Sequence, residues 1–114
     1  MEDHLISILN SFSYPVRRQG SFASGEEYPN HFFTFWNNDT TSSKHYNNQL
    51  KTLNHYYSVN FYSIDPEKMY QVINELITRL KENGWMVESY GYDVASDEPT
   101  HTGRGVGIVY NQEV

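Results

Sequence analysis

The clearest pattern of hydrophobic and polar positions lies between residues 65 and 84. Apolar side chains recur there at the spacing of one helix face. They are Met69, Val72, Ile73, Leu76, Ile77 and Leu80. Asp65 can cap the free backbone amides, and Pro66 suits the first turn because its missing N–H costs nothing there. Gly84, after Asn83, supplies the left-handed end. The pattern predicts an amphipathic helix packed on a core.

Alternating positions and strand-forming side chains predict strands on both sides of this helix. Residues 53–62 alternate between an apolar row and a polar-aromatic row, which is typical of a half-buried strand. The run HFFTFW is rich in strand formers. The complete set of predicted strands is residues 16–22, 31–36, 53–62, 85–92 and 104–110.

Two polar stretches interrupt the predicted strands. Residues 37–49 are polar and aperiodic, and we expect a long loop or contact arm. Residues 93–103 form an acidic, proline-containing loop between two short apolar runs. Gly105 and Gly107 share one face of the strand that follows this loop, which predicts a close approach of another chemical group to that face.

The order of elements defines the fold that we expect. A short amphipathic helix over residues 3–12 ends before Pro15, because the residue before proline is pushed out of the helical region. The resulting order is α-β-β-β-α-β-β. It predicts an α+β fold: a mainly antiparallel sheet of about four to five strands, with one long helix packed on a face and a short N-terminal helix. A length of 114 residues predicts a single domain, 1–114.

Composition narrows the classes of function. The chain has 14 acidic and 8 basic side chains, and its net charge of -6 opposes a protein that binds nucleic acid by neutralising phosphates. It contains 0 cysteines, which excludes disulfides, thiolate catalysis and cysteine-bound zinc. The polar N-terminus and the short apolar runs predict neither a signal peptide nor a membrane span, so we expect a cytosolic origin. The 10 tyrosines favour half-buried sheet faces and subunit interfaces.

The loop over residues 93–103, with the residue after it, is the one candidate for chemistry. It offers Asp93, Asp97, Glu98, His101 and Arg104. Carboxylates beside a histidine could bind a metal or act as a base, but their spacing matches neither an EF-hand nor a zinc signature. No nucleophile elbow accompanies them, and the GRGVG run enters a strand instead of the helix that a phosphate loop needs. We therefore predict no enzyme and no catalytic, cofactor-binding or metal site.

Two segments carry a resemblance to a known family. They are HYYSVNFYSIDPEKMYQVINELITRLKENGW and GYDVASDEPTHTGRGVGIVY. With Tyr57, Val59, Phe61 and Ser63 before the helix start at Asp65, the chain resembles tail terminator (tail-completion, head–tail joining) proteins of long-tailed bacteriophages. The similarity covers roughly residues 30 to 110. The acidic loop after Tyr92 does not correspond to a general feature of that family.

The resemblance implies a structural role in the virion. Proteins of this group form a homo-oligomeric ring, commonly a hexamer, that caps the finished tail tube and joins it to the head connector. The expected partners are other copies of the chain, the major tail protein and the connector or neck proteins. DNA is expected to pass through the ring without specific binding, and no membrane is involved. The expected location is the tail or neck of the virion, after synthesis in the host cytoplasm.

The surfaces expected to contact neighbouring subunits are the 37–49 stretch, the polar-aromatic row of residues 53–62 and the 93–103 loop. The individual candidates are His45, Tyr46, Tyr56, Tyr62, Asp93, Asp97, Glu98, His101 and Arg104. Three alternatives stay open: another neck or head-closure component, a monomeric adaptor that binds through its aromatic sheet, and a small metal-dependent enzyme that uses the acidic loop.

Overall fold

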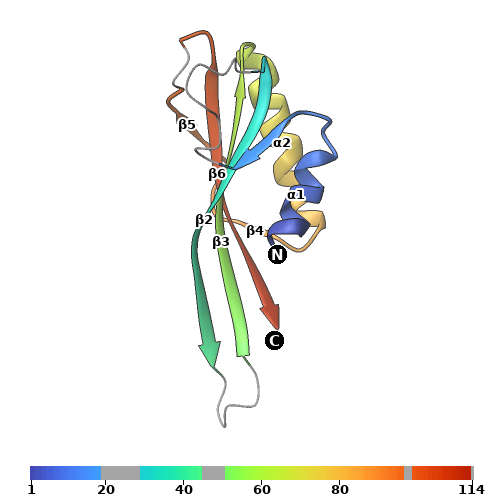
Figure 1. The fold of residues 1–114 in the computed structure, drawn as a ribbon, viewed down its shortest axis with the longest axis vertical. Coiled ribbons are helices and arrows are strands. Elements are labelled where there is room, and N and C mark those ends of the chain that lie inside the picture. Colours follow the sequence, from blue (N-terminus) through green and yellow to red (C-terminus); the bar gives the residue numbers. More distant parts are fainter. Residues whose placement is uncertain (19–28, 45–50, 97–98, 114) are drawn as a thin grey trace.

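A computed structural model describes residues 1–18, 29–44, 51–96 and 99–113 (Figure 1). Two helices and six strands follow one another along the chain. They are α1 (Glu2–Asn10), β1 (Val16–Arg18), β2 (His31–Lys44), β3 (Lys51–Ser63), α2 (Pro66–Glu82), β4 (Met86–Val87), β5 (Tyr92–Val94) and β6 (Thr102–Glu113).

The strands form one mixed sheet. Its order is β1-β2-β3-β6-β4, and β5 also pairs with β6. β1 runs parallel to β2, whereas the pairs β2–β3, β3–β6, β4–β6 and β5–β6 are antiparallel. The predicted fold class was therefore wrong: the sheet has six strands and mixed pairing instead of four or five mainly antiparallel strands beneath a single long helix. The pair is parallel because β2 starts at the same end of the sheet as β1 and lies directly beside it.

Both helices lie over the same face of the sheet (Figure 1). Leu5, Ile8 and Leu9 of α1 join the apolar stripe of α2 in one core. The sheet contributes alternate residues to that core, namely Phe33, Phe35, Tyr57, Val59, Phe61, Val106 and Ile108. The short N-terminal helix and the predicted stripe of α2 are thus confirmed as elements, although the class built from them was not.

The start and end of α2 follow the capping signals of the sequence. The Asp65 carboxylate accepts a hydrogen bond from the Glu67 amide at 3.0 Å, and Pro66 occupies the first turn. At the other end the Asn83 side chain donates to the Arg79 carbonyl at 2.7 Å. Gly84 then adopts a φ of +88°, a backbone conformation that side chains other than glycine rarely adopt.

The opposite face of the sheet has a buried glycine row. A Cβ atom added at Gly105 would lie 2.3 Å from Asn60 Oδ1, and one added at Gly103 would lie 2.7 Å from the Tyr62 ring. The predicted close approach is confirmed at Gly105, where the side-chain amide of Asn60 in β3 fills the space of the missing side chain. At Gly107 the nearest atom would be 3.7 Å away, so that position has room.

The central strands continue beyond the helices as a three-stranded extension (Figure 1). We call residues 39–44, 51–56 and 110–113 the arm. The predicted loop over residues 37–49 was wrong for its first part, because β2 continues to Lys44 and pairs with β3 there. Cross-strand pairing overrides the weak strand propensity of the Asn and Asp side chains in this stretch. The strand predicted over residues 85–92 is likewise reduced to β4 and the start of β5.

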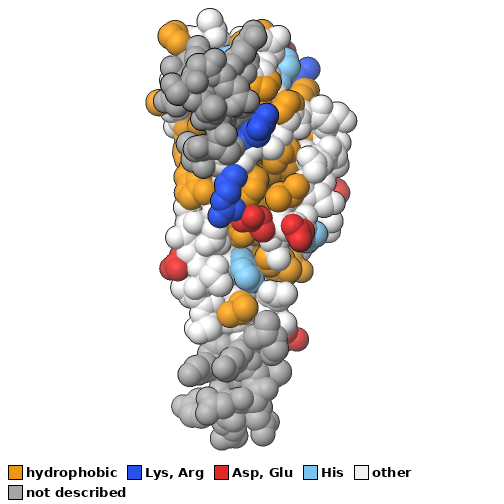
Figure 2. All heavy atoms as spheres, in the orientation of Figure 1, with side chains coloured by type: hydrophobic (Ala, Val, Ile, Leu, Met, Phe, Trp, Pro, Cys, Tyr) orange, Lys and Arg blue, Asp and Glu red, His pale blue; other side chains and the backbone are white. Residues whose placement is uncertain are grey.

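The arm gives the molecule its shape. The extents are 54 × 29 × 22 Å and the radius of gyration is 15.4 Å. A compact domain of about 100 residues has a radius of gyration of about 13 Å. None of the buried core residues lies in the arm, and Figure 2 shows the hydrophobic side chains of this view gathered mainly on the helix-bearing half.

Candidate functional site

A bulge marks the point where β2 leaves the helix-covered half. The pairing with β3 shifts register between Asn37 and Asp39. The Asn37 side chain donates hydrogen bonds to the carbonyls of Asp39 at 3.2 Å and of Tyr56 at 3.3 Å. Asn38, the extra residue, donates to Ser58 Oγ at 2.6 Å. A bulge bends its strand and increases the twist, so these asparagines set the direction of the arm.

The base of the arm carries a small polar cluster on the helix-bearing face. Glu2 Oε1 accepts hydrogen bonds from Arg18 Nη1 at 2.6 Å and from the Tyr57 hydroxyl at 3.2 Å. Burial, with the Glu2 carboxylate beside it, raises the pKa of Tyr57 above its usual value. The cluster therefore joins α1, β1 and β3 at the level where the helical layer ends.

Within the arm the side chains contact one another through hydrogen bonds. His55 Nε2 lies 2.9 Å from Gln112 Oε1 of β6, so this ring nitrogen donates to the side-chain oxygen of Gln112. Asn54 Nδ2 donates to Thr41 Oγ1 at 3.3 Å across the β2–β3 pair. Tyr56 is half-buried on the face opposite the helices. His45 and Tyr46, which were predicted contact residues, lie outside the described residues.

The predicted residues of the 93–103 region are only partly brought together. Arg104 Nη1 donates to Asp93 Oδ1 at 2.9 Å, and its guanidinium lies over the Tyr70 ring of α2 at 5.0 Å. Gly91 leaves space for this arginine, since a Cβ there would lie 2.8 Å from Arg104 Nε. The pair fastens β5 and β6 to α2. Asp97 and Glu98 lie outside the described part of the chain.

His101 supports the chain at the other end of this loop. Its Nε2 lies 2.8 Å from the Pro29 carbonyl, which can only accept, so Nε2 carries the proton. Nδ1 then accepts from the Thr100 hydroxyl at 3.2 Å. The ring also meets Phe32 edge-on, with centroids 5.8 Å apart. The Nε2 bond therefore holds the segment before β2 against the start of β6, whereas the Nδ1 bond is local.

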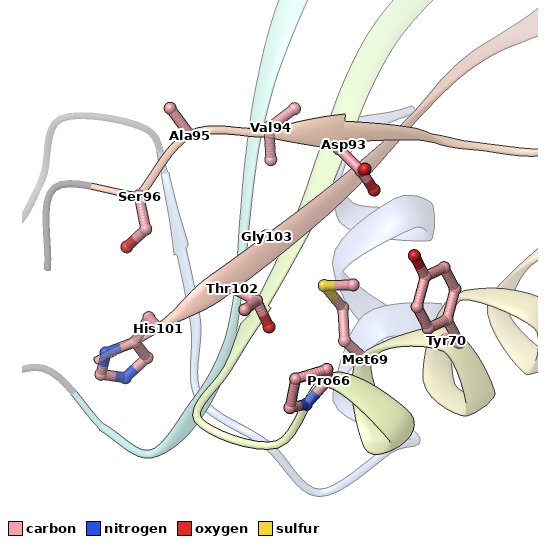
Figure 3. A pocket seen from close by; sticks show the side chains of 10 residues that line it. All are labelled: Pro66, Met69, Tyr70, Asp93, Val94, Ala95, Ser96, His101, Thr102 and Gly103. Atoms are coloured by element: carbon pink, nitrogen blue, oxygen red, sulfur yellow. The ribbon is translucent and has the colours of Figure 1, made fainter. Parts of the chain in front are cut away.

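A shallow cavity of about 380 Å³ lies between α2 and the β5–β6 region (Figure 3). Pro66, Met69 and Tyr70 form its helix side, and Val94 and Ala95 come from the strand side. Asp93 points toward Tyr70 at one end, whereas Ser96 and His101 lie at the other (Figure 3). In the described part of the chain no group of three His, Cys, Asp or Glu side chains could hold a metal ion.

Tyr62 lies in the packed interior of the opposite face. It is 8% exposed, stacks on Phe32 with ring centroids 5.1 Å apart, and its hydroxyl accepts from Asn60 Nδ2 at 3.1 Å.

Sequence reasoning missed Asn37, Glu2 and Arg18. Asparagine in a polar stretch between two strands was the available signal for the bulge, but residue type alone does not reveal which carbonyls it will meet.

A second histidine links β2, β3 and the start of α2. His31 Nδ1 lies 2.8 Å from Ser63 Oγ, and the same oxygen accepts from the Asp65 amide at 3.0 Å. The serine hydroxyl can donate to an unprotonated Nδ1 or accept from a protonated one, because its oxygen has two lone pairs. Burial, and then the nearby Lys68 ammonium, lower the pKa of His31 below its usual value.

The chain matches no model of a known protein family, and a search of curated proteins finds no relative. Among the described residues no helix is long and apolar enough to cross a membrane.

Proposed function

We propose that this protein is a structural virion protein of a long-tailed bacteriophage. It forms a ring at the head-proximal end of the tail tube, ends tail polymerisation and joins the tail to the head connector. The resemblance over residues 55–85 and 91–110 supports this role. A hexamer is the stoichiometry expected from the resemblance.

The arm is the observation that carries the proposal. A three-stranded ribbon without a hydrophobic layer gains little stability by itself, because strands need an apolar face or a packed helix for independent stability. The arm exposes Asp39, Thr40 and Thr41 in succession on β2, outside the helical layer. The molecule is 54 Å long along its longest axis, and the arm forms one end of that axis, where it is suited to reaching a neighbour.

The charge of the chain supports the expected passage of DNA. A net charge of -6 repels phosphates, so a ring of these subunits would let DNA pass without a specific contact. Of the two exposed arginines of β1, Arg18 is compensated locally because it is paired with Glu2.

Deletion of the gene from the phage tests the proposal. Electron microscopy of the lysate should show tail tubes of irregular, excessive length that are separate from filled heads, and the gene supplied from a plasmid should restore virions of normal length. Tails of normal length beside unattached heads would assign the chain to another neck or head-closure role instead. Intact, infectious virions without the gene would overturn a structural role altogether.

A metal titration separates the proposal from the enzyme alternative. Addition of Mg²⁺, Mn²⁺ or Zn²⁺ to the purified protein should leave the melting temperature unchanged. His101→Gln, which keeps a side chain that can donate to the Pro29 carbonyl, should leave phage yield intact. A metal-dependent rise in melting temperature that this variant abolishes would favour the enzyme.

A further inference from the structure

Within the arm, the described chain leaves two outer backbone edges open, one on β2 and one on β6. β1 pairs with β2 only at residues 33–35, so the described chain leaves the outer edge of β2 unpaired from residue 36 to Lys44. On the other side, β5 and β4 pair with β6 as far as Val109. The described chain likewise leaves the outer edge of β6 unpaired over residues 110–113. An unpaired edge presents free N–H and C=O groups to another strand.

The composition of these edges favours specific pairing over aggregation. Monomeric proteins shield an edge with a bulge, and β2 has one between Asn37 and Asp39. That bulge lies at the base of the arm, however, and residues 39–44 pair with β3 without further interruption. Asp39, Thr41 and Ser42 on this strand are exposed and polar. A strand that pairs with this edge would therefore gain main-chain hydrogen bonds without burying apolar side chains.

The direction of the strands determines which pairing can build a ring. β2 and β6 are both antiparallel to β3, so they run in the same direction. A second copy in the same orientation would place its β2 beside β6 of the first copy as a parallel pair. This contact uses different surfaces on the two copies, and only such a head-to-tail contact closes into a ring. The two strands end in residue types of opposite charge, β2 at Lys44 and β6 at Glu113.

We infer that the outer edge of β6, residues 110–113, pairs in parallel with the outer edge of β2, residues 39–44, of a second copy of this chain. The pairing uses each open edge once per subunit and continues the sheet from copy to copy. The inference rests on the ring of the proposed function and identifies the contact that holds it together.

Engineered cysteines test this joint, and the chain has 0 cysteines of its own. Thr41 and Asn111 both pair with Asn54 and are exposed, so their side chains share the sheet face opposite the helices. Adjacent strands lie about 5 Å apart, within the Cα separation of about 4.4–6.8 Å that a disulfide needs. Ser42 is the matched control, because it lies on the same edge but faces the other side of the sheet.

The experiment compares Thr41→Cys/Asn111→Cys, Asp39→Cys/Asn111→Cys and Ser42→Cys/Asn111→Cys under mild oxidation. At least one of the first two should lose its monomer band and give a ladder of trimers and larger species on a non-reducing gel. The Ser42 variant and each single variant should run as monomers, as the wild type does on the same gel. The Asp39 position covers a register offset of one pleat.

Three results would overturn the joint. Dimers from Thr41→Cys alone would indicate that two β2 edges pair with each other. A ring of native mass in the wild type, together with no ladder from either double variant, would place the contact elsewhere and leave the proposed function standing. A monomer at every concentration that also fails to bind tail tubes would reject both the joint and the proposed function.

Discussion

The helix-covered half and the arm belong to the same sheet but are held together by different forces. In the helix-covered half, α1 and α2 bury one face of β2, β3 and β6 against a continuous apolar core. In the arm the same strands continue with polar side chains joined by hydrogen bonds such as His55 to Gln112. Burial stabilises the first region on its own, whereas exposed hydrogen bonds contribute little net free energy because water competes for them.

The two regions differ in what surrounds their strands and not in how the strands pair. Both regions have complete β2–β3 and β3–β6 registers, so backbone pairing alone does not distinguish them. The distinguishing feature is what covers the faces and the edges. Apart from Tyr110, whose ring packs against His4 of α1, the arm lies beyond the helices and its outer edges are open. Such a region is suited to contact a neighbour.

The largest expected effect lies in the helix-covered half, at the glycine row. Gly105→Ala should destabilise the protein by about 1–3 kcal/mol, because its Cβ would lie 2.3 Å from the buried Asn60 Oδ1. Gly107→Ala is the control, since the nearest atom there would be 3.7 Å away. Denaturant unfolding measures both. The double variant Gly105→Ala/Asn60→Ser should recover part of the loss, and additivity of the two single effects would contradict this contact.

A smaller effect is expected at the bulge. Asn37→Ala should lower the free energy of unfolding by about 1 kcal/mol, because it removes hydrogen bonds to the Asp39 and Tyr56 carbonyls. Amide hydrogen exchange should accelerate in the arm and stay unchanged in α2. Asn74→Ala, on an exposed position of α2, is the control. Equal acceleration in both regions would mean that the bulge supports the whole fold.

The smallest effect is a dependence on pH at the start of β2. Because the pKa of His31 is lowered in the folded state, the unfolded chain binds more protons near the usual value of 6.5. Stability should therefore decline as the pH falls through that value. His31→Gln should flatten the curve between about pH 8 and about pH 5 relative to the wild type. Parallel curves for the two proteins would show that His31 does not contribute.

The sequence was most informative where one physical rule acted locally. Asp65, Pro66 and Gly84 fixed the limits of α2, and the apolar spacing fixed the face that it buries. The sheet was less predictable, because β1 has only three residues and its parallel pairing depends on where the chain happens to return. The strand over residues 37–44 was not predicted, because its polar side chains show no alternation and its pairing with β3 determines the structure.

The candidate contact residues illustrate a limit of another kind. Sequence alternation placed Tyr56 and Tyr62 on one face, but Tyr56 is half-buried in the arm and Tyr62 is packed beside Phe32. Alternation reports the face of a sheet, and it does not report how far each position lies from the covered half. The ion pair between Asp93 and Arg104 could not be predicted from the sequence, because it depends on the β5–β6 register that places these two residues opposite each other.

The most direct test of the account is amide hydrogen exchange measured at two protein concentrations, one below and one above the concentration at which the chain assembles. Assembly should slow exchange at residues 39–44 and 110–113, the two outer edges of the arm, and should leave exchange in α2 unchanged. Exchange that slows over α2 or the 93–103 region while both edges keep their rates would contradict it.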